Sequence, residues 1–288
     1  MPILIFIRDV LLLTAVQLLA IMGTFFFFGL LLYLLARFTR ATFVKSIGQQ
    51  FDVYITGWIG TPIHEIGHAL FCIPFGHKIT EMKLFSPDKK DGSLGYVNHS
   101  YNPRNIWHLI GNFFIGFGPI FFGSLVLFLL IKFLVPDNQQ LLTIIASQKI
   151  DLSNLSGFLQ QFVSLFEAGK NTFFGLFSTA NLHSWQFWIF LYLALSISSH
   201  MELSPSDIKG LGMGLLAIVI FLVLVNGVCL FFEFDTSSYI NQIAGYSQLT
   251  AGIFTISTVI SLLFFVVSFI VLNIYTFLRH GNLFHPFA

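Results

Sequence analysis

Charged residues are scarce in this sequence, and their scarcity excludes a water-soluble protein. Lys, Arg, Asp and Glu make up 9% of the 288 residues, whereas they account for about a quarter of an average globular domain. So few charges cannot cover the surface of a soluble chain of this length. Because hydrophobic residues make up 56% of the sequence, we expect most of the surface to face lipid, including the abundant phenylalanines.

An excess of one charge sign is also missing, and cysteines are few. Fourteen basic and 13 acidic residues give a formal net charge of +1, which excludes a nucleic-acid-binding surface or an acidic tail. The two cysteines, Cys72 and Cys229, both lie in apolar segments. We interpret them as small buried hydrophobic side chains rather than a disulfide framework.

Long apolar runs, by contrast, are frequent. Runs of about 18 or more residues predict an all-α polytopic membrane protein with about six transmembrane helices. The predicted spans are Val10–Ala36, Val53–Phe75, Ile106–Val135, Trp185–Met201, Leu211–Phe232 and Thr250–Leu278. The first run is too long for a removable signal peptide, so we expect it to remain as a membrane anchor.

Two long connections separate these spans. Residues 77–105, between the second and third spans, are polar, and their two halves alternate in character around a turn signal from Pro87 to Gly92. This pattern predicts a small membrane-associated β-hairpin. Residues 136–184 are poor in charge and rich in Phe and Leu, so we expect amphipathic helix on the bilayer surface.

The distribution of basic residues indicates an orientation. The basic hairpin, Lys209 and Arg279 favour the cytoplasmic side, and the stretch Glu233–Leu249, which lacks Lys and Arg, favours the outside. Six spans then place both termini in the cytoplasm, with the plasma (inner) membrane as the expected location. The basic residues between 37 and 45 do not fit this orientation, because they fall on the outer side.

The most informative polar cluster lies inside the second span, in the sequence His64-Glu65-Ile66-Gly67-His68. Two histidines four residues apart stand on one face of a helix, one turn apart, where both imidazoles can reach the same metal ion. A glutamate beside the first of them can reach a metal-bound water and act as a general base. A fortuitous match, or an interhelical hydrogen-bond cluster, is the competing interpretation.

A zinc site needs a third protein ligand and an open fourth position. Asp207 is the best candidate, because Pro205 ends the fourth span and a broken helix at membrane depth is tolerated where it lines a polar cavity. The alternative is that Asp207 only caps the fifth helix. Glu202 and His200 lie close by in the sequence and are rival ligands.

Together these residues resemble the site-2 protease family of intramembrane zinc metalloproteases. The resemblance rests on the His-Glu-x-x-His motif, a glycine (Gly76) before a predicted strand, Gly118-Pro119 in the next span, and Pro205 followed by Asp207. The chain departs from the family in two places: Phe121-Phe122-Gly123 replaces the usual asparagine after Gly-Pro. The element around Asp207 is shorter, with Glu202 in place of asparagine.

The resemblance implies one Zn²⁺ per chain held by His64, His68 and Asp207, with Glu65 as the catalytic residue. It implies a metalloprotease core at residues 53–210, comprising three spans, the hairpin and the segment 136–184. Residues 1–52 would be an N-terminal anchor and linker, and residues 211–288 a two-helix extension. The hairpin would present an edge strand to the transmembrane segment of a membrane-protein substrate.

A second function remains open from the residues alone. Six spans and a broken helix also suit a non-proteolytic carrier that uses the same pocket for a metal or small solute. A third possibility is a different His-Glu-x-x-His membrane protease with Glu202 as the third ligand. Against the carrier, transport needs no glutamate between two metal ligands.

Overall fold

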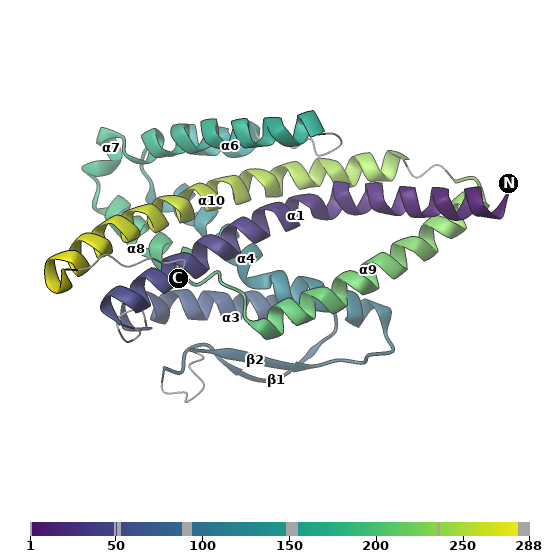
Figure 1. Ribbon diagram of the computed structural model, residues 1–288, viewed down its shortest axis with the longest axis horizontal. Helices are drawn as coiled ribbons and strands as arrows, with labels where there is room; N and C mark the ends of the chain where they lie inside the picture. Colours follow the sequence, from purple (N-terminus) through teal and green to yellow (C-terminus); the bar gives the residue numbers. More distant parts are fainter. Residues whose placement is uncertain are drawn as a thin grey trace.

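A computed structural model describes residues 2–48, 50, 53–87, 94–147, 155–234 and 237–281 of the chain. The described residues are mostly helical, with one two-stranded antiparallel sheet (Figure 1). In chain order the elements are α1 (Ile3–Ile47), the π-helical turn η1 (Val53–Gly57), α3 (Trp58–Cys72), β1 (Lys78–Lys83), β2 (Tyr96–Ser100), α4 (Ile106–Leu134), α5 (Gln139–Ser147), α6 (Leu155–Leu176), α7 (Thr179–Leu182), α8 (Trp185–Ser198), α9 (Pro205–Phe231) and α10 (Ser237–His280).

Four helical stretches among the described residues are long and apolar enough to cross a membrane, namely Met22–Ile47, Ile106–Leu134, Pro205–Phe231 and Thr250–His280. They overlap the predicted first, third, fifth and sixth spans, and they identify a helical membrane protein. The predicted second and fourth spans correspond to shorter helices, α3 with 15 residues and α8 with 14. The predicted count of six therefore depends on these two short helices.

The predicted hairpin is present. Strands β1 and β2 pair antiparallel, with Lys78 opposite Ser100 and Lys83 opposite Tyr96 and an irregularity after Ile79. Most of the predicted turn, residues 88–93, lies outside the described residues.

The segment 136–184 contains α5, α6 and α7, with residues 148–154 outside the described part. Helix α6 lies alongside α10 (Figure 1), and the predicted position of this segment on the bilayer surface stays a prediction.

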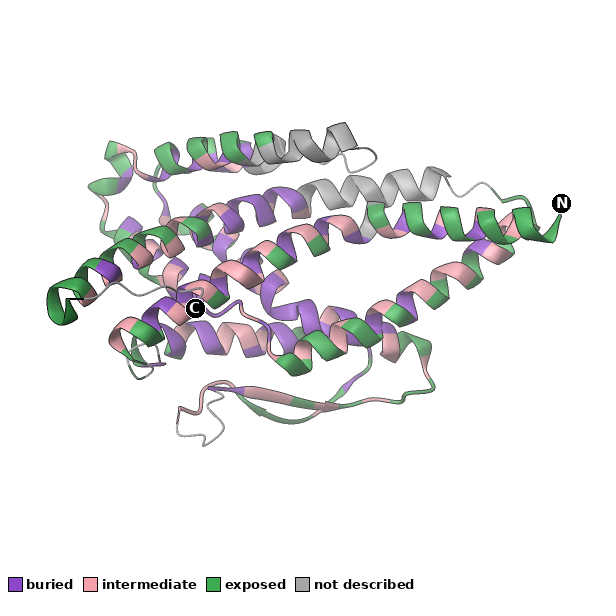
Figure 2. Cartoon of the chain, in the orientation of Figure 1, coloured by how far each residue is buried: buried purple, intermediate pink, exposed green. Residues whose placement is uncertain are grey.

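Many phenylalanines are buried in the interior, whereas others, such as Phe133 and Phe231, are exposed, so the expectation that these residues face lipid is correct only in part. Phe28, Phe187 and Phe254 are at most 1% exposed. Phe117 makes edge-to-face contacts with Phe25 and Phe254, with ring centroids 5.4 and 6.0 Å apart. Buried residues gather along the middle of α1 and of α10, which contact each other and α4, and along α3 and α4 (Figure 2). Aromatic edge-to-face packing explains why so many large side chains fit in one core.

Glycines let the helices that carry the motif approach closely. A Cβ atom on Gly118 of α4 would lie 2.4 Å from the carbonyl oxygen of Gly67 in α3, and one on Gly67 would lie 2.7 Å from the carbonyl oxygen of Gly118. On the other side of α4, a Cβ on Gly116 would lie 2.7 Å from the carbonyl oxygen of Asp207 in α9. Small residues at helix crossings are typical of membrane proteins, and here they bring α3, α4 and α9 together at one point.

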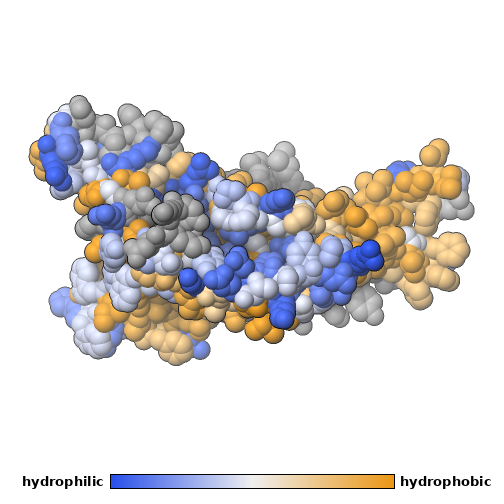
Figure 3. Space-filling view, turned by 90° about the horizontal axis from the view of Figure 1, so that it is seen from below, coloured by the Kyte–Doolittle hydropathy of each residue, from blue (hydrophilic) through white to orange (hydrophobic). Residues whose placement is uncertain are grey.

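Helices α1 and α9 are joined by a buried polar cluster far along α9 from Asp207. The carboxamide of Asn226 exchanges hydrogen bonds with that of Gln17, at 2.9 and 3.0 Å, and donates another to Thr14 at 3.0 Å. Viewed from the hairpin side, the end of the molecule near the start of α1 is strongly hydrophobic, whereas hydrophilic residues gather towards the middle (Figure 3).

Candidate metal centre

Helix α3 places the two motif histidines one turn apart on the same face. The Nε2 atoms of His64 and His68 lie 3.2 Å apart. Both side chains are largely enclosed, at 13% and 9% exposed. The predicted pairing of these two rings is therefore present in the fold.

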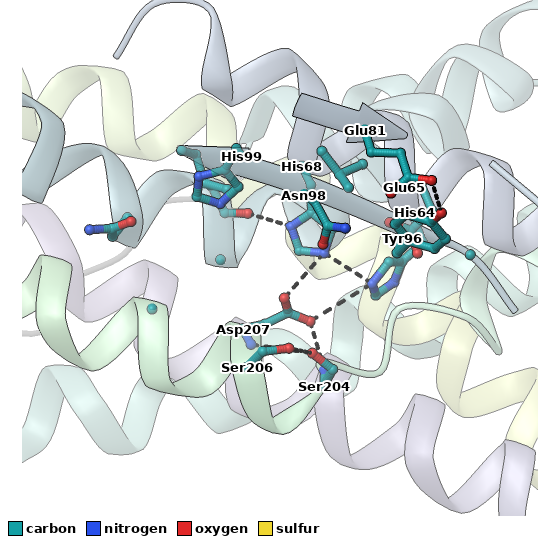
Figure 4. A pocket seen from close by; sticks show the side chains of 16 residues that line it. His64, Glu65, His68, Glu81, Tyr96, Asn98, His99, Ser204, Ser206 and Asp207 are labelled. Atoms are coloured by element: carbon teal, nitrogen blue, oxygen red, sulfur yellow. Dashed lines mark hydrogen bonds and ion pairs between the residues drawn. The ribbon is translucent and has the colours of Figure 1, made fainter. Parts of the chain in front are cut away.

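Asp207 reaches the same point from the start of α9. Its Oδ1 atom lies 3.3 Å from Nε2 of His68, and its Oδ2 atom lies 3.9 Å from Nε2 of His64 (Figure 4). The same carboxylate accepts a hydrogen bond from the backbone N–H of Ser204 at 2.7 Å, and the Ser204 hydroxyl accepts one from the Asp207 N–H. Asp207 thus caps α9 in a capping box and also faces both histidines.

The backbone carbonyls that contact the two rings determine which nitrogen of each ring carries a proton. Nδ1 of His64 bonds the backbone carbonyl of His200 at 2.8 Å, and Nδ1 of His68 bonds that of Ile115 at 2.7 Å. Because a carbonyl only accepts hydrogen bonds, each Nδ1 carries a proton, and in the neutral ring each Nε2 presents a lone pair. Two lone pairs and a carboxylate then converge, an arrangement that a cation would stabilise.

These distances are close to those of a tetrahedral metal site. An ion about 2.0–2.1 Å from each of three donors holds those donors about 3.3–3.4 Å apart. The two Nε2 atoms are 3.2 Å apart, and Asp207 approaches them with different oxygens, Oδ1 at 3.3 Å from His68 and Oδ2 at 3.9 Å from His64. Among the described residues, His64, His68 and Asp207 form the one group of metal-ligating side chains whose donor atoms all lie within 4.8 Å of one another. The predicted ligand set can therefore hold a metal ion.

Glu65 lines a cavity of about 680 Å³ together with the three donors. Its side chain is buried, and the hairpin forms the facing wall of the cavity through residues 95–99 (Figure 4). The Tyr96 hydroxyl donates a hydrogen bond to the Glu81 carboxylate, and this bond raises the pKa of Tyr96. A cavity of this volume has room for several residues of an extended chain.

The rival ligands take other positions. Glu202 lines a second cavity, of about 270 Å³, which shares His64 and Glu65 with the first, but it is not part of the group of three donors. His200 contributes its backbone carbonyl, while its ring nitrogen Nδ1 lies 3.1 Å from the carbonyl of Ser196.

Several residues of the site were not predicted from the sequence. The carbonyls of Ile115 and His200 carry no signal in the sequence, because every residue has a carbonyl. Asn112, in α4, also lines the larger cavity and is 4% exposed. An asparagine within an apolar predicted span was a signal that could have drawn attention to it.

Comparisons of the chain with protein-family models, curated proteins and solved structures found no match.

Proposed function

We propose that the protein is an integral-membrane zinc endopeptidase that hydrolyses peptide bonds within or beside the transmembrane segments of other membrane proteins. One zinc ion per chain would be held by His64, His68 and Asp207. The observation that supports this most is the convergence of two imidazole nitrogens and a carboxylate beside the buried carboxylate of Glu65, in one cavity of a membrane protein. The site-2 protease family remains the family that the motifs resemble.

The chemistry divides between the metal and the chain. Bound zinc would polarise the scissile carbonyl and make a water molecule acidic enough to attack near neutral pH. Glu65 accepts the proton from that water and passes it to the leaving amine. The carbonyls of His200 and Ile115 orient the imidazoles, so that each Nε2 faces the cavity.

The hairpin would hold the substrate. A transmembrane helix satisfies its carbonyls internally, so its chain must unwind locally before attack. Strand β2 lines the cavity, and pairing the edge that faces away from β1 with an extended substrate segment would replace the hydrogen bonds lost on unwinding.

We further propose that the chain crosses the membrane six times. Helix α3, extended by η1, and α8 would be the two spans in addition to the four long helices. With the hairpin on the cytoplasmic side, both termini lie in the cytoplasm and water reaches the metal from that side. The plasma (inner) membrane is the proposed location.

Replacement of the base tests the mechanism. A single-span membrane protein is co-expressed with wild type or with Glu65→Gln, and its cleavage is followed by immunoblotting. We expect the variant to lose about 10²–10⁴-fold in cleavage rate, because the proton acceptor is gone, while its zinc content stays that of wild type. Equal cleavage by the two proteins would remove the mechanism. Metal-dependent flux into vesicles without proteolysis would favour the carrier instead.

A further inference from the structure

Gly95 brings the backbone of the hairpin into contact with the proposed base. It directly precedes β2, and it lines both cavities, as Glu65 does. A Cβ atom on Gly95 would lie 2.8 Å from Cγ of Glu65 and 2.9 Å from Cγ2 of Thr61, two residues of α3. The same atom would lie 2.9 Å from the carbonyl oxygen of Leu84, in the other half of the hairpin. Glu65 and the hairpin therefore touch at residues that the two cavities share.

The absence of a side chain at Gly95 is required by space and not by the backbone. Among the described glycines, those with a positive φ are Gly48, Gly76 and Gly281, so the backbone conformation at Gly95 is open to alanine as well. Carbon atoms that are not bonded to each other lie about 3.5–4.0 Å apart at their best separation. A Cβ at this position would therefore displace at least one of its neighbours.

Among the three neighbours, the side chain of Glu65 yields most easily. The Leu84 carbonyl is part of the backbone, and beside it the N–H of Ser86 donates to the Leu94 carbonyl at 2.6 Å, which holds the two halves of the hairpin together. Thr61 is β-branched and therefore stiff at χ1. A glutamate side chain has three torsions, each with more than one accessible well. The hairpin backbone thus restricts a side chain that would otherwise take several positions.

We propose that Gly95 is a positioning residue, through which the hairpin backbone holds the Glu65 side chain in place in the cavity of the three metal donors. This inference rests on the proposed function, because it concerns the general base of that reaction. A general base acts only within hydrogen-bond reach of the proton that it accepts, and a misplacement of about 1 Å can cost about a hundredfold in rate. The hairpin then has two tasks: it binds the substrate and it places the base.

The positioning role is tested by ligand binding rather than by cleavage. The probe is benzohydroxamate, which chelates a metal through its two oxygen atoms and shares its proton with a neighbouring carboxylate. Its dissociation constant is measured by isothermal titration calorimetry on zinc-loaded protein in detergent. The variants are Gly95→Ala, Glu65→Gln and the two combined. Gly227→Ala is the matched control, because it adds the same methyl group in open space on α9.

Gly95→Ala and Glu65→Gln should each raise the dissociation constant about tenfold, since each takes a carboxylate away from the bound hydroxamate. The combined variant should also raise it about tenfold and not about a hundredfold, because two residues that act through one contact are not additive. Zinc content should equal that of wild type throughout, and Gly227→Ala should bind like wild type. An unchanged dissociation constant in Gly95→Ala, additive effects, or loss of zinc from Gly95→Ala would overturn the positioning role.

If Gly95→Ala does not fold, the same variants are made in a Thr61→Ser background, which removes the methyl group that a Cβ at Gly95 would meet. Cleavage is measured separately, and Gly95→Ala should cleave the single-span substrate about a hundredfold more slowly than wild type. A wild type that cleaves, without the coupling in hydroxamate binding, supports the peptidase and overturns the positioning role. A wild type that cleaves nothing, with the coupling, contradicts the peptidase and supports Gly95 as the residue that places Glu65.

Discussion

Asp207 serves the fold and the site with the same carboxylate. Its Oδ2 atom accepts the N-cap hydrogen bond from Ser204, and its Oδ1 atom lies 3.3 Å from His68. The sequence offered these roles as alternatives, a helix cap or a metal ligand, and the geometry contains both. Because a carboxylate has two oxygens and about four lone pairs, the cap leaves enough capacity for an ion.

Removal of the Asp207 carboxylate should therefore weaken metal binding and lower the stability of the fold. We expect Asp207→Ala to lose the bound metal on dialysis and about 1 kcal/mol of stability with the capping-box hydrogen bond from the Ser204 N–H. Glu202→Ala is the matched control: it removes a neighbouring carboxylate outside the donor group and should keep the metal. Metal is measured by mass spectrometry of the purified proteins. Loss of the metal in Glu202→Ala, with the metal retained in Asp207→Ala, would identify Glu202 as the third ligand.

His77 should make stability depend on pH. Burial lowers its pKa, and the hydrogen bond to the His108 carbonyl offsets only part of this effect, so the unfolded chain takes up the proton before the folded one. The contribution of His77 to the free energy of unfolding is then fully present above the ordinary histidine pKa of about 6.5, and it is lost as the pH drops below that value. Thermal unfolding in detergent, compared at about pH 7.5 and about pH 5.5, should show this loss, and His77→Phe should reduce it.

The control for this pH effect is His183→Phe, which alters the exposed histidine that directly follows α7. An equal loss of unfolding temperature in wild type and His77→Phe would show that His77 does not carry the effect.

At the scale of helices, the site depends on how closely α3 approaches α4. The Ile115 carbonyl reaches the ring of His68 because Gly67 and Gly118 let the two backbones touch. In the sequence, Gly67 belongs to the His-Glu-x-x-His motif and Gly118 to the Gly-Pro pair of the family resemblance. Neither pattern predicts which backbone carbonyl would reach the His68 ring. That depends on the crossing of two helices, which no local pattern records.

Addition of one methyl group at this crossing tests its importance. Gly118→Ala should destabilise the protein, because a Cβ only 2.4 Å from a backbone oxygen forces the helices apart at a cost of about 1–3 kcal/mol. The metal should also bind more weakly. Gly212→Ala, at a position with open space around it, should be neutral or slightly stabilising, since alanine favours helix. Equal unfolding temperatures for the two variants would contradict the tight crossing.

For the whole molecule, periodicity and composition predicted the helical membrane class and the hairpin, because apolar length and strand alternation are local signals. The motif predicted His64 and His68 as neighbours for the same reason. The burial of phenylalanine was not predicted, since an apolar side chain suits lipid and core alike. The hairpin's place as a wall of the cavity also depends on tertiary packing.

His64, His68 and Asp207 are the proposed ligands of one divalent metal ion in the membrane. The decisive measurement is the metal content of the purified wild-type protein by mass spectrometry, with the double variant His64→Ala/His68→Ala prepared in parallel. We predict about one zinc per wild-type chain and almost none in the variant, because two of three donors are gone. Equal metal content in the two proteins, or none in either after zinc loading, would contradict the account.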